Sequence, residues 1–99
     1  DRFVDRVIDA IEHKVPRVFL HWEDFGRANA QRYLQRYQSR ICTFNDDIQG
    51  TGIVTLAALM AAVQHNQSQL ADQRIVIYGA GTAGAGIAHQ IYTALTDHY

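Results

Sequence analysis

The spacing of apolar residues alternates between helical and strand-like patterns along the chain. Apolar side chains recur at intervals of three and four over 3–15, which predicts an amphipathic helix that Pro16 ends. The segment 17–22 is short, apolar and β-prone, and it predicts a buried strand. A second helix is predicted over 27–38 and a second short strand over 41–44.

The second half of the chain continues this alternation. After a polar turn at 45–51, the alanine-rich and almost uncharged segment 53–63 predicts a helix buried on several sides. A third strand is predicted over 75–78, followed by a glycine-rich loop and a last helix that ends near Leu95. Strands that alternate with helices form parallel sheets covered on both faces. The predicted fold class is therefore α/β, an alternating helix–strand fragment with the start of a Rossmann-type parallel sheet.

Composition and charge narrow the class of protein. Of the 99 residues, 47% are hydrophobic and 19% are charged, which is typical of a globular domain. The net charge of −1 predicts no polybasic surface for nucleic acid or an anionic membrane. The apolar run 53–63 falls well short of the ~20 residues of a membrane span. Because no secretory signal opens the sequence, we expect a cytoplasmic location.

Both ends of the sequence indicate that it belongs to a longer protein. The only methionine is Met60, so Asp1 does not resemble a translation start, and the sequence stops at Tyr99 inside or just after a helical pattern. We therefore expect any functional site to be incomplete and the isolated segment to be inactive. The second polar turn offers a domain boundary, which divides the chain into segments 1–45 and 46–99.

A glycine-rich loop follows the third predicted strand. Gly79, Gly81 and Gly84 form the pattern G-x-G-x-x-G between a strand and a helix, the context in which it binds a dinucleotide. In that role the first glycine makes the tight turn, the second admits the pyrophosphate, and the third lets helix and strand pack closely. The alternative is a glycine-rich helix start that serves packing alone. The residue that distinguishes NAD from NADP is expected ~20 residues beyond the loop, at or past Tyr99.

Two acidic pairs follow the first two predicted strands. Glu23 and Asp24 come after one strand, and Asp46 and Asp47 come after the next. Because parallel strands end at one edge of a sheet, the two pairs can converge although they are distant in sequence. Clustered carboxylates repel one another unless a cation neutralises them, and oxygen ligands suit Mg²⁺ or Mn²⁺. The alternative is that these side chains only cap helices.

The remaining reactive side chains favour structural roles. We interpret Cys42, in an apolar run, as a small core residue, and His21 beside Trp22 as structural. Tyr33 and Tyr37 are expected in the core. The arginines of the second predicted helix lie on its polar side, which is expected to be a solvated face, and they are Arg27, Arg32, Arg36 and Arg40.

Three motifs occur along the chain in a characteristic order. They are W-E-D-F-G-R-A-N-A at 22–30, C-T-F-N-D-D-I-Q-G-T-G at 42–52 and I-Y-G-A-G-T-A-G-A-G-I-A at 77–88. Together they resemble the malic enzyme and malolactic enzyme family over nearly the whole sequence, and the middle motif is highly specific. The resemblance implies that 1–45 is the C-terminal part of a malate- and metal-binding domain. By the same resemblance, 46–99 is the N-terminal part of an NAD-binding Rossmann domain.

The resemblance also implies roles for individual residues. Glu23, Asp24 and Asp47 would be the protein ligands of a Mn²⁺ or Mg²⁺ ion, and Asp46 would lie behind them, hydrogen-bonded near the general base. NAD would be bound by the loop residues Gly79, Ala80, Gly81, Thr82, Ala83, Gly84 and Gly86. Family members often carry alanine at the third glycine position of the loop. The family's general-base Lys, general-acid Tyr and substrate-binding Arg match no position here and are expected upstream of Asp1.

The implied activity is a decarboxylation of L-malate that depends on NAD and a divalent metal. The segments 48–54 and 78–84 look closest to the malolactic branch of lactic acid bacteria, in which malate becomes lactate and CO₂. The alternative is an NAD-dependent malic enzyme, which releases pyruvate, CO₂ and NADH. A nucleotide-binding module without catalysis is a more distant alternative. The full-length protein is expected to be a homo-oligomer, with no nucleic-acid or membrane partner.

Overall fold

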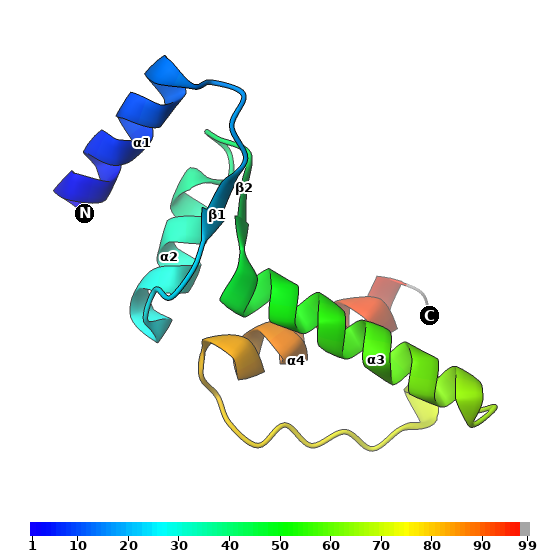
Figure 1. The fold of residues 1–99 in the computed structure, drawn as a ribbon. Helices are drawn as coiled ribbons and strands as arrows, with labels where there is room; N and C mark the ends of the chain where they lie inside the picture. Colours follow the sequence, from blue (N-terminus) through cyan, green and yellow to red (C-terminus); the bar gives the residue numbers. More distant parts are fainter. Residues whose placement is uncertain (98–99) are drawn as a thin grey trace.

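The computed structural model describes residues 1–97, and His98 and Tyr99 at the end of the predicted segment 46–99 lie outside the described residues (Figure 1). Helices and strands alternate in the first half, and the second half is helical. The elements in chain order are α1 (Arg2–Lys14), β1 (Leu20–Trp22), α2 (Arg27–Tyr37), β2 (Thr43–Asn45), the π-helical turn η1 (Asp46–Gly50), α3 (Thr51–His65), the 3-10 turn η2 (Leu70–Asp72) and α4 (Thr82–Asp97).

The two strands β1 and β2 form a small parallel sheet, and α2 connects them. The register pairs Leu20 with Thr43, His21 with Phe44 and Trp22 with Asn45. Both strands therefore end at the same edge of the sheet. The α/β class and the parallel arrangement predicted for this half are confirmed.

An aromatic core lies between α1, α2 and the sheet. Trp22 stacks on both Tyr33 and Tyr37, with ring centroids 5.8 Å apart in each pair. Ile8 of α1 closes the core, and both it and Tyr37 are fully buried. The prediction that the two tyrosines belong to the core is confirmed. Because they are four residues apart on α2, they share one helix face.

A ladder of ion pairs joins α1 to α2 beside this core. Arginines spaced four apart, two on α2 and one just after it, meet aspartates spaced four apart at the N-cap of α1 and within it. The pairs are Arg32–Asp1, Arg36–Asp5 and Arg40–Asp9. The arginine side chains are 38–48% exposed, so the predicted solvated face is in fact a half-exposed contact between helices. The side chain of Arg27 lies outside the described part of the structure.

The second half of the chain is built on the packing of α4 against α3 and η1 (Figure 1). The contact is closest at Gly86, where an added Cβ would lie 2.4 Å from the carbonyl oxygen of Ile48. Any larger side chain at this position would push the two helices apart.

The prediction of a third strand over 75–78 is wrong. The segment 73–80 is extended but pairs with neither described strand, and it forms the long yellow connection in Figure 1. Val76 is 89% exposed and Tyr78 is fully exposed. A strand needs a neighbouring strand to bond its backbone N–H and C=O groups, and local β-propensity does not supply one.

The expected burial of the helix over 53–63 is also wrong. Val54 is 69% exposed and Met60 is 49% exposed, because α4 covers only one side of α3 within the described residues. Together η1 and α3 form one helix, Asp46–His65, whose length and mean hydropathy of 1.2 are sufficient for a membrane span. Core helices of soluble proteins meet the same criteria, so this finding carries little weight alone.

The interpretation of Cys42 as a core residue is wrong as well, since its side chain is exposed. Its neighbour Ile41 is buried in the aromatic core. Successive side chains of an extended segment point to opposite faces, so the burial of Ile41 turns Cys42 outward.

Candidate metal and dinucleotide site

The two acidic pairs converge at the edge where the strands end. Glu23 and Asp24 follow β1 directly, and Asp47 lies in η1, which follows β2. One carboxylate oxygen from each of these three residues lies within 4.8 Å of the other two. The parallel sheet therefore brings together the three residues proposed from the sequence as metal ligands, and we call this group the carboxylate cluster.

The backbone at the cluster is unusual at one position. Asp24 has a φ of 57°, in the left-handed region that few residues other than glycine adopt. Aspartate tolerates this conformation better than most side chains do. A residue held in this conformation at a cluster of carboxylates is typical of a functional site.

The alternative that the acidic pairs cap helices is not what the structure shows. The cap of η1 is Asn45, whose side-chain oxygen accepts a hydrogen bond of 3.0 Å from the N–H of Ile48. The side chain of Gln49 reaches back and accepts a 2.9 Å hydrogen bond from the N–H of Asn45. The residue that precedes α2 is Gly26, and no side chain caps that helix. The carboxylates are therefore free for another partner.

The electrostatics of the cluster favour a cation. Partial desolvation, followed by the negative charges of Asp46, Asp47 and Asp24, raises the pKa of Glu23 above its ordinary value. The side chain of Glu23 is 53% exposed, so an ion can reach it from solvent. Three hard oxygen donors and mutual repulsion fit a divalent ion such as Mg²⁺ or Mn²⁺.

The glycine loop lies between the extended segment 73–80 and α4. Gly79 has a φ of 129°, which in practice requires glycine, and a Cβ on Gly84 would lie 2.3 Å from the carbonyl oxygen of Gly79. The loop is thus folded tightly against the first turn of α4. A Cβ on Gly81 would meet nothing within 4 Å, so the backbone there is open to a ligand. The N–H groups of the first helical turn, which begins at Thr82, suit an anionic phosphate.

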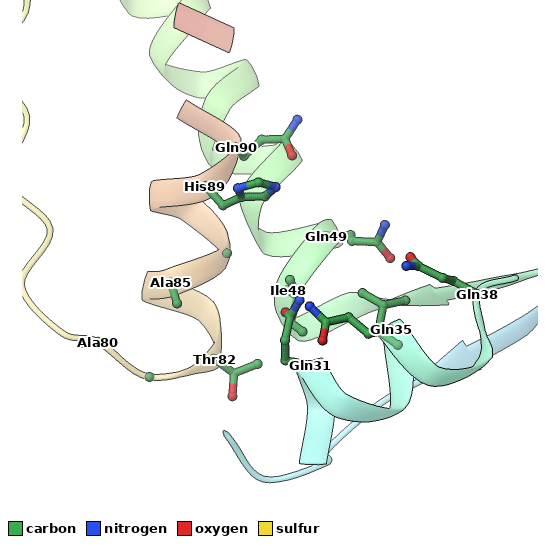
Figure 2. A pocket seen from close by; sticks show the side chains of 13 residues that line it. Gln31, Gln35, Gln38, Ile48, Gln49, Ala80, Thr82, Ala85, His89 and Gln90 are labelled. Atoms are coloured by element: carbon green, nitrogen blue, oxygen red, sulfur yellow. The ribbon is translucent and has the colours of Figure 1, made fainter. Parts of the chain in front are cut away.

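A cavity of about 680 Å³ opens beside this loop, between α2, η1 and α4 (Figure 2). Its volume falls in the usual range for small-molecule sites, ~300–1,000 Å³. The lining contains no Asp, Glu, Lys or Arg, and its polar side chains include Gln31, Gln35, Gln38, Gln49, Thr82 and His89. No sequence pattern marks these glutamines, because a glutamine that lines a cavity has the same local pattern as one on a solvated surface.

The carboxylate cluster and the cavity share one structural element. Ile48 and Gln49, which line the cavity, follow Asp47 directly in η1. An ion at the cluster and a ligand in the cavity would therefore both contact this turn. The sequence predicts the turn as a polar loop, whereas the structure shows it as a helical turn continuous with α3.

The parallel strands and the glycine loop at the start of α4 place the chain among α/β proteins with a Rossmann-type nucleotide-binding domain. Comparison with known proteins identifies the family within this class. Residues 48–98 match the family model described as malic enzyme, NAD binding domain, and residues 1–38 match the malic enzyme N-terminal domain. The chain therefore belongs to the malic enzyme family.

Individual relatives include both branches of the family. The chain is 55% identical over 95 residues to the NAD-dependent malic enzyme of Schizosaccharomyces pombe and 50% identical over 95 residues to NAD-dependent malic enzyme 3 of Bacillus subtilis. It is 50% identical over 93 residues to the malolactic enzyme of Leuconostoc mesenteroides. These matches cover 94–96% of the chain and 17% of each relative. The boundary between 45 and 46 falls between the two matched family segments and stays a prediction.

Proposed function

We propose that the protein containing this chain decarboxylates L-malate with NAD and a divalent metal ion, Mn²⁺ or Mg²⁺. The observation that carries this proposal is the carboxylate cluster, whose ligand oxygens lie within 4.8 Å of one another in a chain of the malic enzyme family. The malic enzymes of S. pombe and B. subtilis, by their names, depend on NAD.

In this proposal Glu23, Asp24 and Asp47 hold the metal ion. The bound ion supplies a Lewis acid toward the oxygens of malate. Asp46 is proposed to lie outside the ligand set, beside Glu23, and a Cβ added to Gly50 would be 2.5 Å from the Oδ1 atom of Asp46. The role proposed for Asp46 is to orient the general base, which the family resemblance assigns to a lysine upstream of Asp1.

The dinucleotide is proposed to bind along the glycine loop. The open backbone at Gly81 and the free N–H groups of the first turn of α4 receive the pyrophosphate. The walls of the adjacent cavity offer donors and acceptors without placing a carboxylate against the phosphates. The proposed contacts with the dinucleotide come from Gly79, Ala80, Gly81, Thr82, Ala83 and Gly84. Gly86, which the resemblance also assigns to the loop, is buried in α4 and borders the cavity, so its proposed role is to hold α4 close to η1.

For the type of reaction we propose the malolactic one, in which malate becomes lactate and CO₂ with no net change in NADH. It is supported by the resemblance of 48–54 and 78–84 to that branch. The second candidate is oxidative decarboxylation to pyruvate, CO₂ and NADH. It is favoured by the 55% identity to the S. pombe malic enzyme, against 50% and 46% to the malolactic enzymes of L. mesenteroides and Lactococcus lactis.

Product analysis of the full-length protein tests both levels of the proposal. The protein is incubated with L-malate, NAD and Mn²⁺, and lactate, pyruvate and NADH are quantified. Lactate without net NADH supports the malolactic reaction, and pyruvate with an equal amount of NADH supports the malic enzyme reaction. If folded protein binds both Mn²⁺ and NAD but does not turn over malate, the proposal of malate decarboxylation is contradicted, whichever product type is considered.

A further inference from the structure

A histidine stands beside the carboxylate cluster and is not accounted for by the sequence motifs. The Nε2 atom of His21 lies 3.7 Å from Oε2 of Glu23 and 3.6 Å from Oδ1 of Asp46. Its side chain is 48% exposed, so solvent and a ligand can reach the imidazole. Among the side chains that the structure describes, it is the only Lys, Arg or His with a nitrogen within 4.0 Å of either carboxylate.

The sheet holds the imidazole ring in place. His21 is the middle residue of β1 and the register partner of Phe44, and the two rings meet edge to face with centroids 5.6 Å apart. Phe19 completes this group of rings, with its centroid 6.5 Å from the imidazole and 6.2 Å from Phe44. Because side chains alternate along a strand, the burial of Trp22 directs His21 to the opposite face.

The carboxylates of Glu23 and Asp46 are close together and, among the described residues, lack a hydrogen-bond donor between them. One carboxylate oxygen of Glu23 and one of Asp46 lie within 4.8 Å of each other, so their negative charges repel. The Asp46 side chain lies beside Gly50, where a Cβ would come within 2.5 Å of its Oδ1 atom, and it is 47% exposed. No described side chain donates a hydrogen bond to either carboxylate at normal length, and Nε2 of His21 is the described side-chain nitrogen that faces both.

We propose that His21 is a positioning residue that orients Glu23 for metal binding by donating from Nε2 to the carboxylates of Glu23 and Asp46. This inference rests on the proposed metal site. A carboxylate has two oxygens, so Glu23 can present one to the ion and accept from His21 with the other. The distances of 3.6 and 3.7 Å exceed a normal hydrogen bond, and contacts of this kind tighten when the site is assembled.

The principal alternative is that His21 binds the ion directly through Nε2. His21, Glu23 and Asp46 also place one ligand atom each within 4.8 Å of one another. Mn²⁺ and Mg²⁺ prefer oxygen donors, and the cluster already offers three from Glu23, Asp24 and Asp47. Positioning is therefore the role that leaves the all-oxygen ligand set intact.

The proposal is tested in the full-length protein with variants that keep either the N–H donor or the aromatic ring of His21, but not both. His21→Gln places an amide N–H near the position of Nε2, whereas His21→Phe keeps the ring against Phe44 but removes the donor. His21→Asn is a second donor-deficient variant, because its shorter amide does not reach that position. The dissociation constant of Mn²⁺ is measured from the electron paramagnetic resonance signal of the free ion, without turnover. Unfolding midpoints in the absence of metal show whether each variant is folded.

We expect His21→Phe and His21→Asn to weaken Mn²⁺ binding by ~10-fold or more, the usual effect of losing a partner that orients a metal ligand. His21→Gln should stay within about three-fold of the wild type, because it keeps the donor. Unchanged affinity in both donor-deficient variants would overturn the inference, and so would a His21→Gln variant as weak as His21→Phe. A ¹⁴N coupling to bound Mn²⁺ in the spin-echo spectrum that disappears in His21→Gln would overturn it in favour of direct ligation. Failure of the wild type itself to bind Mn²⁺ would instead overturn the proposed function, and this inference with it.

Discussion

The two halves of the chain bury their apolar residues to very different extents. In the first half, the aromatic residues Trp22 and Tyr37 are 5% and 0% exposed, between two helices and a sheet. In the second half, the apolar helix α3 leaves Ile53 and Val54 at 49% and 69% exposure. The second half has the higher share of hydrophobic residues, so amino-acid composition does not explain why its apolar side chains are less buried. Burial depends on how many packing partners surround an element, and α3 has one long partner among the described residues.

The ion-pair ladder adds to this contrast. In the first half, charged residues of α1 and α2 meet along the rim of the core, while α3 and α4 meet through small residues such as Gly86. The first half therefore combines apolar and polar contacts across elements distant in sequence. The carboxylate cluster lies at the junction, because Glu23 and Asp24 belong to the first half and Asp47 opens the second.

The largest predicted effect separates buried from exposed apolar residues. Tyr37→Ala removes a fully buried ring that stacks on Trp22, and we expect it to lower the free energy of unfolding by ~3–5 kcal/mol. Val54→Ala in α3 should change it by no more than ~0.5 kcal/mol, since the side chain is mostly exposed. Urea unfolding of the 99-residue chain, followed by the fluorescence of its single tryptophan, measures both. Equal losses in the two variants would contradict the contrast between the halves.

The second prediction concerns the junction. Asp47→Asn removes one charged ligand and should lower malate turnover of the full-length protein by ~100-fold, about 2.7 kcal/mol of activation free energy. Without metal, the same variant should unfold at the same temperature as the wild type or higher, because repulsion with Glu23 is reduced. The upward shift of the unfolding midpoint by Mn²⁺ in the wild type should be largely absent in the variant. A variant with wild-type turnover and a wild-type Mn²⁺ shift would refute the assignment of Asp47.

The third prediction compares two glycines of the second half. Gly86→Val forces a side chain against the backbone of Ile48, and overpacking of this kind lowers stability by ~1–3 kcal/mol. A Cβ at Gly81 meets nothing within 4 Å, so in Gly81→Val the fold should persist while NAD affinity falls by ~10-fold or more, because the pyrophosphate can no longer approach. Thermal unfolding and titration calorimetry with NAD on the full-length protein separate the two outcomes. Unchanged NAD affinity in Gly81→Val would mean that the loop serves packing only.

The smallest expected effect is the acid sensitivity of the ladder. A hydrogen bond from the Tyr37 hydroxyl, together with the charge of Arg36, holds the pKa of Asp5 below its ordinary value. A carboxylate with a lower pKa when folded stabilises the protein above its unfolded pKa of about 3.9, and this contribution is lost as the pH falls through the folded pKa. Asp5→Asn should therefore reduce stability at pH 7 and have less effect at pH 2. Unfolding midpoints at the two pH values, each at low and high salt, check the sign. A variant that destabilises equally at both pH values would contradict the role of the charge.

Local patterns predicted most of the elements and the place of the carboxylate cluster. The three- and four-residue spacing before Pro16 predicts a helix close to Arg2–Lys14, because amphipathic periodicity is a property of the sequence itself. The convergence of Glu23 and Asp24 with Asp47 followed from one general rule, that parallel strands end at the same edge. The family resemblance came from the same segments and is confirmed by the family models.

Other features could not be read from local patterns. The segment 75–78 has the composition of a strand, but pairing depends on a neighbour that composition does not specify. Cys42 follows the buried Ile41 in an apolar run, yet its own side chain is exposed. The contact of His21 with Asp46 depends on which residue of β2 lies opposite which residue of β1.

The sequence by itself determined the periodic elements, the glycine loop and the acidic pairs, because each depends on residues within one or two turns of one another. Only the tertiary structure decided which side chains are buried, which arginines of α2 meet α1, and which imidazole faces Glu23. Those outcomes depend on register and crossing geometry between segments 20 or more residues apart, such as His21 and Asp46 or Asp5 and Arg36. The free energy of such contacts depends on the relative placement of whole elements, and no local pattern specifies that placement.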